Sequence, residues 1–308
     1  MHAGVKSFNY AYSTSAILPS VEQLRQQVDD SNPLYLVAGN KDIKQPYKHF
    51  LDFMLTLPPV TFRWSTTITQ NSIVQKQSFF SDETVLTDYY NYIAPRYSTL
   101  TTYVNTNGVV TSSLSAAYDV LLNKIKSRLQ LKFSGDYNRF LSYLYEKENV
   151  TNNYGTSLEM TFSTHFSKVF RIKLNSGSSY NYSHNSIKDS YKYLRNNTKL
   201  TVEWNFLERC YLNTLYKFST YKSFGTNISY TTNICNIATG MRFFKNKLDI
   251  GFSVFDLFNR SVDFKTTMFS DYIQNTWTPT FGRYWSVNAV FKFDALNRNK
   301  SGFAPNPG

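Results

Sequence analysis

The sequence predicts an all-β protein, and the fold class that it favours is an antiparallel up-and-down transmembrane β-barrel. Apolar and polar residues alternate along most of the chain, so that segments such as 199–207 and 282–293 have one apolar and one polar face. Many of these segments have about ten or more residues, whereas about five or six is usual in soluble proteins. Short and long links alternate between them, which is typical of outer-membrane barrels.

About twelve strands are expected, and the alternation of short turn and long loop holds from end to end. The predicted strands are 5–15, 47–56, 61–79, 99–121, 128–143, 155–166, 168–185, 199–207, 209–223, 227–243, 247–260 and 282–293. Only the link at 224–226 departs from this rule, because it is short where a loop is expected. In the first long loop, residues 19–25 have the pattern of a short helix with Ser20 as its N-cap. Residues 294–308 are expected to form a disordered polar tail.

The composition excludes several classes of protein. The 308 residues include 33 Lys and Arg against 21 Asp and Glu, which gives a net charge of +12. These basic residues are spread through the chain instead of being clustered, so no nucleic-acid partner is expected. A helical membrane protein is excluded because no stretch of about 18 apolar residues occurs. The first residues lack the apolar core of a secretory signal, so the chain is expected to start within a fold or to be cytoplasmic.

No catalytic or metal site is predicted, and no cofactor is expected. If 209–243 is a hairpin, Cys210 lies opposite about residue 241 and roughly 20 Å from Cys235, so both are expected as thiols. The sequence has no carboxylate pair at acid–base spacing, no phosphate loop and no nucleophile elbow. The chain is therefore not expected to be an enzyme. The histidines are too scattered for a metal cluster: His2, His49, His165 and His184.

Two regions resemble motifs of known outer-membrane proteins. The first region is similar to the proline-serine, NPL and GNPDLKPE run in the barrels of TonB-dependent receptors, and it comprises Pro19 to Leu24, Asp29 to Leu34 and Gly39 to Pro46. Lys41 and Gln45 depart from that run, which has Pro at both places, and Pro46 replaces an acid. The second region resembles the close of the outer-membrane β-barrel family found beside those receptors, and it comprises Phe255 to Asn259, Asp271 to Ile273 and Gly282 to Trp285.

This resemblance implies that the chain is the C-terminal part of a barrel of about 22 strands in the cell outer membrane. Residues 1–293 would be the barrel domain, without a plug domain. The implied function is a TonB-dependent receptor-like importer that binds a ligand at its extracellular loops. The implied partners are outer-membrane lipid, a plug domain and the TonB complex acting through a preceding part of the protein, with a surface lipoprotein as a further candidate.

Two groups of side chains are candidates for contact with a solute. Loop tyrosines stack on sugars and other flat ligands, or else they belong to the aromatic girdle at the membrane interface. These tyrosines are Tyr89, Tyr90, Tyr92, Tyr97, Tyr191 and Tyr193. Basic residues at lumen-facing positions favour anionic solutes or an acidic plug surface, unless they are simply solvated or face lipopolysaccharide. These are Arg63, Lys132, Arg171, Lys173, Lys217 and Lys292.

Two other functions remain open at this level. The first is a soluble or surface-anchored all-β module, such as a carbohydrate-binding domain or an adhesin, whose apolar faces would meet in one core. The second is a stand-alone twelve-stranded passive channel. A closed channel requires the strand at 5–15 to pair with the strand at 282–293, because otherwise both edges stay open.

Overall fold

The computed structural model describes residues 6–164, 169–187, 189–207, 209–225, 228–244, 247–260, 262–268, 273–279 and 281–293. Twelve strands form one continuous antiparallel sheet, called the wall below. In their order across the sheet they are Ser7–Ala16 (β1), Tyr47–Leu57 (β3), Val60–Gln70 (β4), Val109–Leu122 (β9), Ser127–Leu144 (β10), Lys147–Thr164 (β11), Phe170–Asn185 (β12), Tyr191–Phe206 (β13), Cys210–Phe224 (β14), Ser229–Phe243 (β15), Leu248–Phe255 (β16) and Tyr284–Phe291 (β19). The predicted all-β, up-and-down fold class is confirmed.

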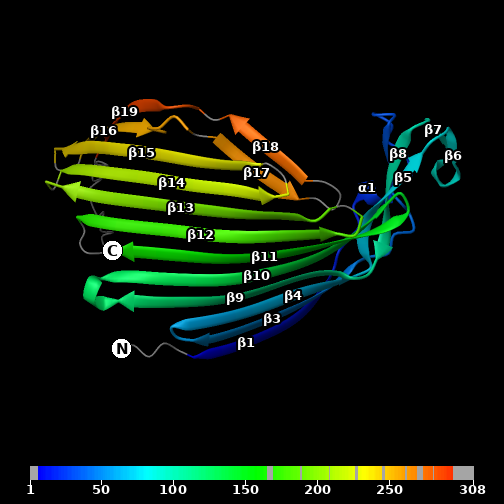
Figure 1. The fold of residues 1–308 in the computed structure, drawn as a ribbon, viewed down its shortest axis with the longest axis horizontal. Coiled ribbons are helices and arrows are strands. Elements are labelled where there is room, and N and C mark those ends of the chain that lie inside the picture. Colours follow the sequence, from blue (N-terminus) through cyan, green and yellow to red (C-terminus); the bar gives the residue numbers. More distant parts are fainter. Residues whose placement is uncertain are drawn as a thin grey trace, which may run out of the picture.

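The wall has a turn end and a loop end, which lie on the left and the right of Figure 1. Near the loop end, the link between β16 and β19 contains a further hairpin, Val262–Met268 (β17) and Ile273–Pro279 (β18), where the sequence analysis expected only a loop. The predicted tail at 294–308 lies outside the described residues. Within the described part of the chain, no helix is long and apolar enough to cross a membrane.

Between β4 and β9 the chain leaves the wall and forms an arm, residues 72–106, seen at the right of Figure 1. Ser72–Phe80 (β5) and Ser98–Thr106 (β8) pair with each other, and Thr84–Leu86 (β6) and Tyr92–Ala94 (β7) pair near the tip. The prediction of single strands over 61–79 and 99–121 is wrong. Asn71 and Gly108, at φ angles of 53° and 95°, redirect the chain although the alternation continues.

The first long loop packs on this arm. Its helix, Val21–Leu24 (α1), begins after Ser20, whose hydroxyl accepts a hydrogen bond from the Gln23 backbone N–H (3.2 Å). The Gln23 side chain accepts one from the Ser20 N–H (2.9 Å), which completes a capping box and confirms the predicted helix. Tyr35–Val37 (β2) then pairs in parallel with β8. The buried core here consists of Leu36, Ala38, Ala94 and Leu100.

The two edges of the wall are open in the described residues. In the part of the chain that the structure describes, β1 pairs only with β3, and β19 pairs only with β16. The pairing of 5–15 with 282–293 that a stand-alone twelve-stranded channel requires is not found among these residues. Each edge strand therefore presents a row of unpaired backbone donors and acceptors.

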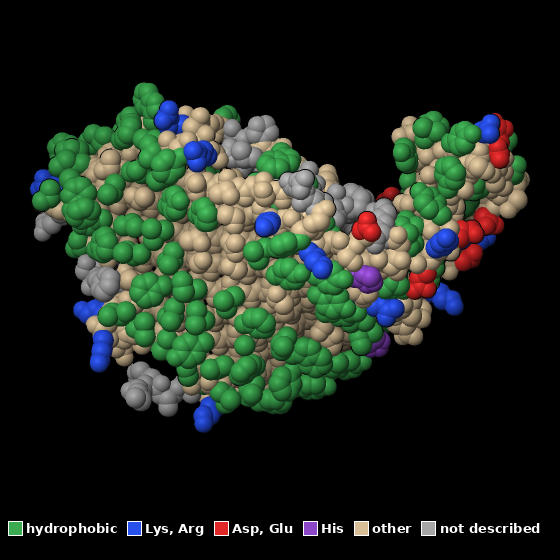
Figure 2. Space-filling view, viewed as in Figure 1, with side chains coloured by type: hydrophobic (Ala, Val, Ile, Leu, Met, Phe, Trp, Pro, Cys, Tyr) green, Lys and Arg blue, Asp and Glu red, His purple; other side chains and the backbone are tan. Residues whose placement is uncertain are grey.

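Strand register gathers the apolar side chains on one face of the wall. Leu131 on β10, for example, lies directly across from Tyr118 on β9 and Met160 on β11. This apolar face is exposed, with exposed fractions of 57% for Leu158 and 71% for Trp285. Figure 2 shows hydrophobic side chains over much of the wall, with acidic side chains gathered toward the arm. Within the described residues, the apolar strand faces do not meet in a core as they would in a soluble sandwich.

One glycine of the wall is required by a neighbouring tyrosine. The Tyr211 ring lies over Gly240, its hydroxyl donates to Asp249 Oδ1 (3.1 Å), and the Arg242 guanidinium lies 5.2 Å from its centre. A Cβ at Gly240 would contact the Tyr211 ring and lie 2.7 Å from the Ile250 carbonyl oxygen. Glycine at position 240 thus leaves room for the hydrogen-bonded Tyr211 ring to lie against the sheet.

Replacing Gly240 by Ala is expected to lower the free energy of unfolding by about 1–3 kcal/mol, because the added methyl group displaces both ring and backbone. Urea titration of the folded chain in lipid vesicles measures this change. Gly135→Ala is the matched control, because the nearest atom to its added Cβ is 4.0 Å away. Equal effects of the two substitutions would contradict the packing of Tyr211 over Gly240.

Candidate ligand-binding surface

All six predicted basic residues lie on the polar face of the wall, opposite the apolar face. The registers of β4, β10, β12 and β14 place the first five there. Lys292 directly follows β19, and its backbone N–H donates to the Lys247 carbonyl (2.7 Å). The face holds Arg63, Lys132, Arg171, Lys173, Lys217 and Lys292.

Acidic side chains offset part of this positive charge. Arg63 Nε lies 2.8 Å from Asp52 Oδ1, and Arg171 Nη1 lies 3.6 Å from Glu203 Oε2. Lys132 lies directly across from Glu159 in the β10–β11 register. The sequence analysis did not detect these pairings, because they depend on which strands are neighbours and at what register.

Three lysines on adjacent strands have no acidic partner at ion-pair distance in the described part of the chain. Lys199 lies directly across from Lys217, and Lys173 is its diagonal neighbour on β12. Among the described residues, none of the three forms an ion pair. Like charges directly opposite each other are unfavourable, so this part of the face favours anions. A cavity of about 480 Å³ lies here, and its charged lining residues are Lys199, Lys217 and Glu159.

Two of the predicted tyrosines support the arm. Tyr89 and Tyr92 pack against the buried core of the arm, and the Tyr89 hydroxyl is hydrogen-bonded to Thr102 Oγ1 (2.9 Å). The Tyr92 hydroxyl donates to Asp30 Oδ2 (3.2 Å) and so ties the first loop to the arm tip. Burial raises the pKa of Tyr92, and the hydrogen bond to Asp30 raises this pKa further. The phenol thus stays a donor at neutral pH.

Two other predicted tyrosines are free to meet a ligand. The exposed fraction of Tyr90 is 79%, and Tyr97 is also exposed. Both have left-handed backbones, with φ angles of 55° and 60°, which turn the side chains out of the arm. The Arg96 guanidinium lies 4.8 Å from the centre of the Tyr97 ring. Arg96 Nε also lies 3.4 Å from Asp82 Oδ1, so these residues form an aromatic tip in which the guanidinium charge is offset.

Tyr191 and Tyr193 belong to an aromatic cluster on the polar face, near the loop end of the wall. Ring centres are 5.4 Å apart for Tyr193 and Tyr221, and 5.3 Å apart for the stacked pair Tyr221 and Tyr230. Trp277 on β18 meets Tyr230 edge to face at 5.7 Å. Tyr191 is buried and shares a hydrogen bond between hydroxyls with Tyr221. The sequence analysis missed three members of this cluster: Tyr221, Tyr230 and Trp277.

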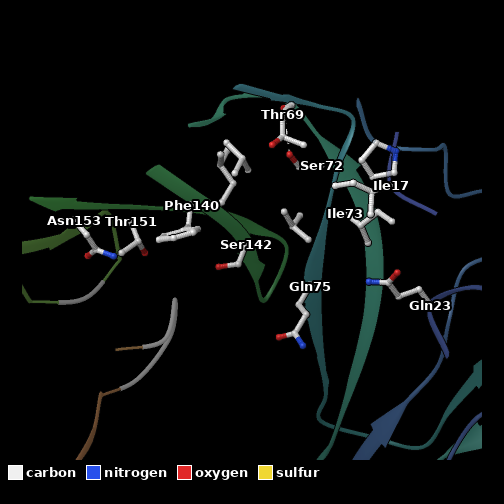
Figure 3. A pocket seen from close by; sticks show the side chains of 14 residues that line it. Ile17, Gln23, Thr69, Ser72, Ile73, Gln75, Phe140, Ser142, Thr151 and Asn153 are labelled. Atoms are coloured by element: carbon white, nitrogen blue, oxygen red, sulfur yellow. Dashed lines mark hydrogen bonds between the residues drawn. The ribbon is translucent and has the colours of Figure 1, made fainter. Parts of the chain in front are cut away.

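A second cavity, of about 490 Å³, lies where the first loop and the arm meet the wall. Figure 3 shows Phe140 and Ser142 on one side and Ile17 and Gln23 on the other. The sequence analysis did not predict this cavity, because its lining comes from segments that are far apart in the chain. It is lined by Ile17, Gln23, Pro46, Thr69, Ser72, Ile73, Val74, Gln75, Val109, Phe140, Leu141, Ser142, Thr151 and Asn153.

The cysteines follow the predicted register. Cys210 lies directly across from Met241, and Cys235 lies across from Tyr216, six residues further along β14. Both are free thiols. Within the described ranges, no group of three or more His, Cys, Asp or Glu side chains is placed to hold a metal ion.

No protein-family model matches this chain, and no curated protein matches it at a significant level. The likeness to the barrels of TonB-dependent receptors therefore rests on the sequence motifs alone. The fold and the side chains of the polar face carry the functional argument.

Proposed function

We propose that this chain is the barrel part of an outer-membrane transport protein, an importer of the TonB-dependent receptor type that binds its solute at the loop end. The exposed apolar face of the wall is the observation that carries this proposal. Contiguous exposed apolar surface of more than a few hundred Å² marks a contact with a membrane or another protein. In this proposal the acyl chains of the lipid cover the apolar face across all the strands of the wall.

Strand dimensions support a membrane location. A tilted strand crosses the hydrocarbon region with about 9–11 residues. β10 has 18 residues and β12 has 16, so both extend beyond that region. In the half of β10 nearer the turn, Leu129, Leu131 and Phe133 lie on one face, beside apolar side chains of β9 and β11. Gln130 and Lys132 lie on the opposite, polar face. This division is expected when one face meets lipid and the other meets water.

The open edges support a larger barrel. Further strands would pair with the free backbone donors and acceptors along the edges of β1 and β19. The barrel of about 22 strands that the motifs imply would supply such strands. In this proposal a plug domain contacts the polar face, and the TonB complex acts through the plug. Outer-membrane lipid covers the apolar face, and a surface lipoprotein is the candidate partner at the loop end.

Solute capture is proposed for the loop end. Tyr90 and Tyr97 project from the arm, and the Arg96 guanidinium, which is paired with Asp82, lies over the Tyr97 ring. The rings stack on flat or cyclic ligands. Solute would then pass along the polar face, where Lys173, Lys199 and Lys217 bias the path toward anions.

Cysteine accessibility on intact cells tests this topology. In a background with Cys210→Ser and Cys235→Ser, we expect a membrane-impermeant maleimide to label Tyr90→Cys but not Leu207→Cys. The two positions are matched, because their exposed fractions are 79% and 81% and both have φ angles near 50°. Permeabilising the outer membrane should then expose Leu207→Cys. Equal labelling of both variants on intact cells would overturn the proposal.

A further inference from the structure

We propose that the cavity between arm and wall binds an uncharged, hydroxyl-rich small molecule with the size of one or two sugar rings. The inference deepens the proposed transport function and rests on it, because the polar face then borders the water from which the solute arrives. The cavity volume of about 490 Å³ lies within the range of small-molecule sites, about 300–1,000 Å³.

Four parts of the chain build this cavity. The first loop contributes Gln23, the start of β5 contributes Ser72, and β10 and β11 contribute Phe140 and Asn153. The arm is held to the wall at this point, because β5 pairs in parallel with β10 at Tyr143 and Leu144. Because this backbone pairing holds the two sides of the cavity together, the cavity is expected to keep its shape without a ligand.

The lining carries no charged side chain. Its polar members have only hydroxyl and amide groups, from Gln23, Thr69, Ser72, Gln75, Ser142, Thr151 and Asn153. A charged ligand in this cavity would lose its hydration without gaining a counter-ion, which is unfavourable. The cavity thus selects neutral molecules, in contrast to the lysine group further along the polar face.

Two polar groups of the lining have hydrogen-bonding capacity that the described structure leaves unused. Asn153 Oδ1 is buried without a hydrogen-bond partner in the described structure, and a buried acceptor of this kind is costly unless something donates to it. Ser142 Oγ accepts a hydrogen bond from Asn149 Nδ2 (3.1 Å), so its own proton is free to be donated. One acceptor and one donor in the same cavity suit a molecule with several hydroxyl groups.

Apolar groups complete the match to a sugar ring. Phe140, which is partly exposed, presents its ring to the cavity beside these polar groups, and Ile17 and Ile73 line the side across from it. Aromatic rings pack on the C–H faces of sugars, while the hydroxyl groups at the sugar edge take hydrogen bonds. The lining thus offers an apolar surface and a polar rim to one ligand.

Calorimetric titration of the full chain in lipid vesicles tests this inference, with glucose and lactose as neutral probes and gluconate and glucosamine as charged analogues. We expect at least one neutral sugar to bind, and each charged analogue to bind at least about tenfold more weakly. Asn153→Leu should weaken sugar binding about three- to tenfold, through the lost hydrogen bond. The same substitution should maintain or raise the thermal midpoint, because it removes a buried amide oxygen without a hydrogen-bond partner in the described structure.

Asn197→Leu is the matched control, because Asn197 lies on the same polar face and outside this cavity. It should leave sugar binding unchanged. Absence of binding by both neutral sugars, equal binding of the charged analogues, or unchanged binding by Asn153→Leu would each overturn the inference. Quenching of Trp204 by brominated lipid in the same vesicles reports membrane contact separately. Quenching without sugar binding would contradict only this inference, and sugar binding without quenching would contradict the membrane proposal.

Discussion

Replacing Leu131 by Arg is expected to destabilise the vesicle-inserted protein by about 2–4 kcal/mol, the cost of a cation on the lipid face of a barrel near the bilayer midplane. Leu131 lies at the centre of the apolar segment of β10, between Tyr118 and Met160 on the neighbouring strands. An Arg there meets acyl chains with no carboxylate in register beside it. Urea titration in vesicles measures the loss.

Gln130→Arg is the control for this substitution. Gln130 is the adjacent residue, but its side chain lies on the polar face and donates to Asp119 Oδ2 (2.9 Å). An Arg at this position keeps a bond to the same carboxylate, so its effect is expected to stay within about 0.5 kcal/mol. If the two variants lost equal stability, the assignment of the two faces would be wrong.

Replacing Leu36 by Ala is expected to loosen the arm and the first loop together, at a cost of about 2–5 kcal/mol. Leu36 is fully buried, with an exposed fraction of 0%, in the cluster with Ala38, Ala94 and Leu100. The lost methyl groups leave a cavity in the compact apolar core beside the β2–β8 pairing. Hydrogen exchange should accelerate in β2, β5 and β8, while the strands of the wall keep their protection.

Leu34→Ala is the matched control, because Leu34 lies two residues earlier and is half exposed. This substitution should have little effect on the rate of hydrogen exchange in the arm. Acceleration that spread equally through β10 and β11 in the Leu36→Ala protein would show that arm and wall unfold as one unit, against this account. The exposed Tyr90 and Tyr97 depend on the same core for their position.

Alternation along the chain was sufficient to predict most of the wall, although β11 and β13 each begin eight residues before the strands predicted at 155–166 and 199–207. Residues 128–134 alternate strictly, and Arg139 and Phe140 interrupt the pattern further along, so the two faces of β10 follow from its first half. The position of Cys210 across from Met241 also follows from the sequence. Alternation was insufficient at Asn71 and Gly108, because a left-handed residue changes the direction of a strand without changing its pattern. The arm was hidden inside two apparently continuous strands for this reason.

The candidate sites were harder to predict than the strands. Alternation predicts on which face of the sheet a tyrosine lies, and the predicted links placed Tyr191 and Tyr193 near the loop end. The ring contacts that join Tyr193, Tyr221 and Tyr230 depend on register as well. The neutral cavity depends on tertiary structure even more, because Gln23 and Asn153 meet only after the arm has paired with β10.

Tryptophan quenching by brominated lipids tests the central claim, that the apolar face contacts acyl chains while the polar face borders water. Single-tryptophan variants, with Phe at the other three tryptophan positions, compare Trp204 on the apolar face with Trp277, which packs on Tyr230 at the polar face. Both side chains are about half exposed, so exposure alone does not separate them. We expect strong quenching of Trp204 and little quenching of Trp277. Equal quenching of the two, or none at Trp204, would contradict the account.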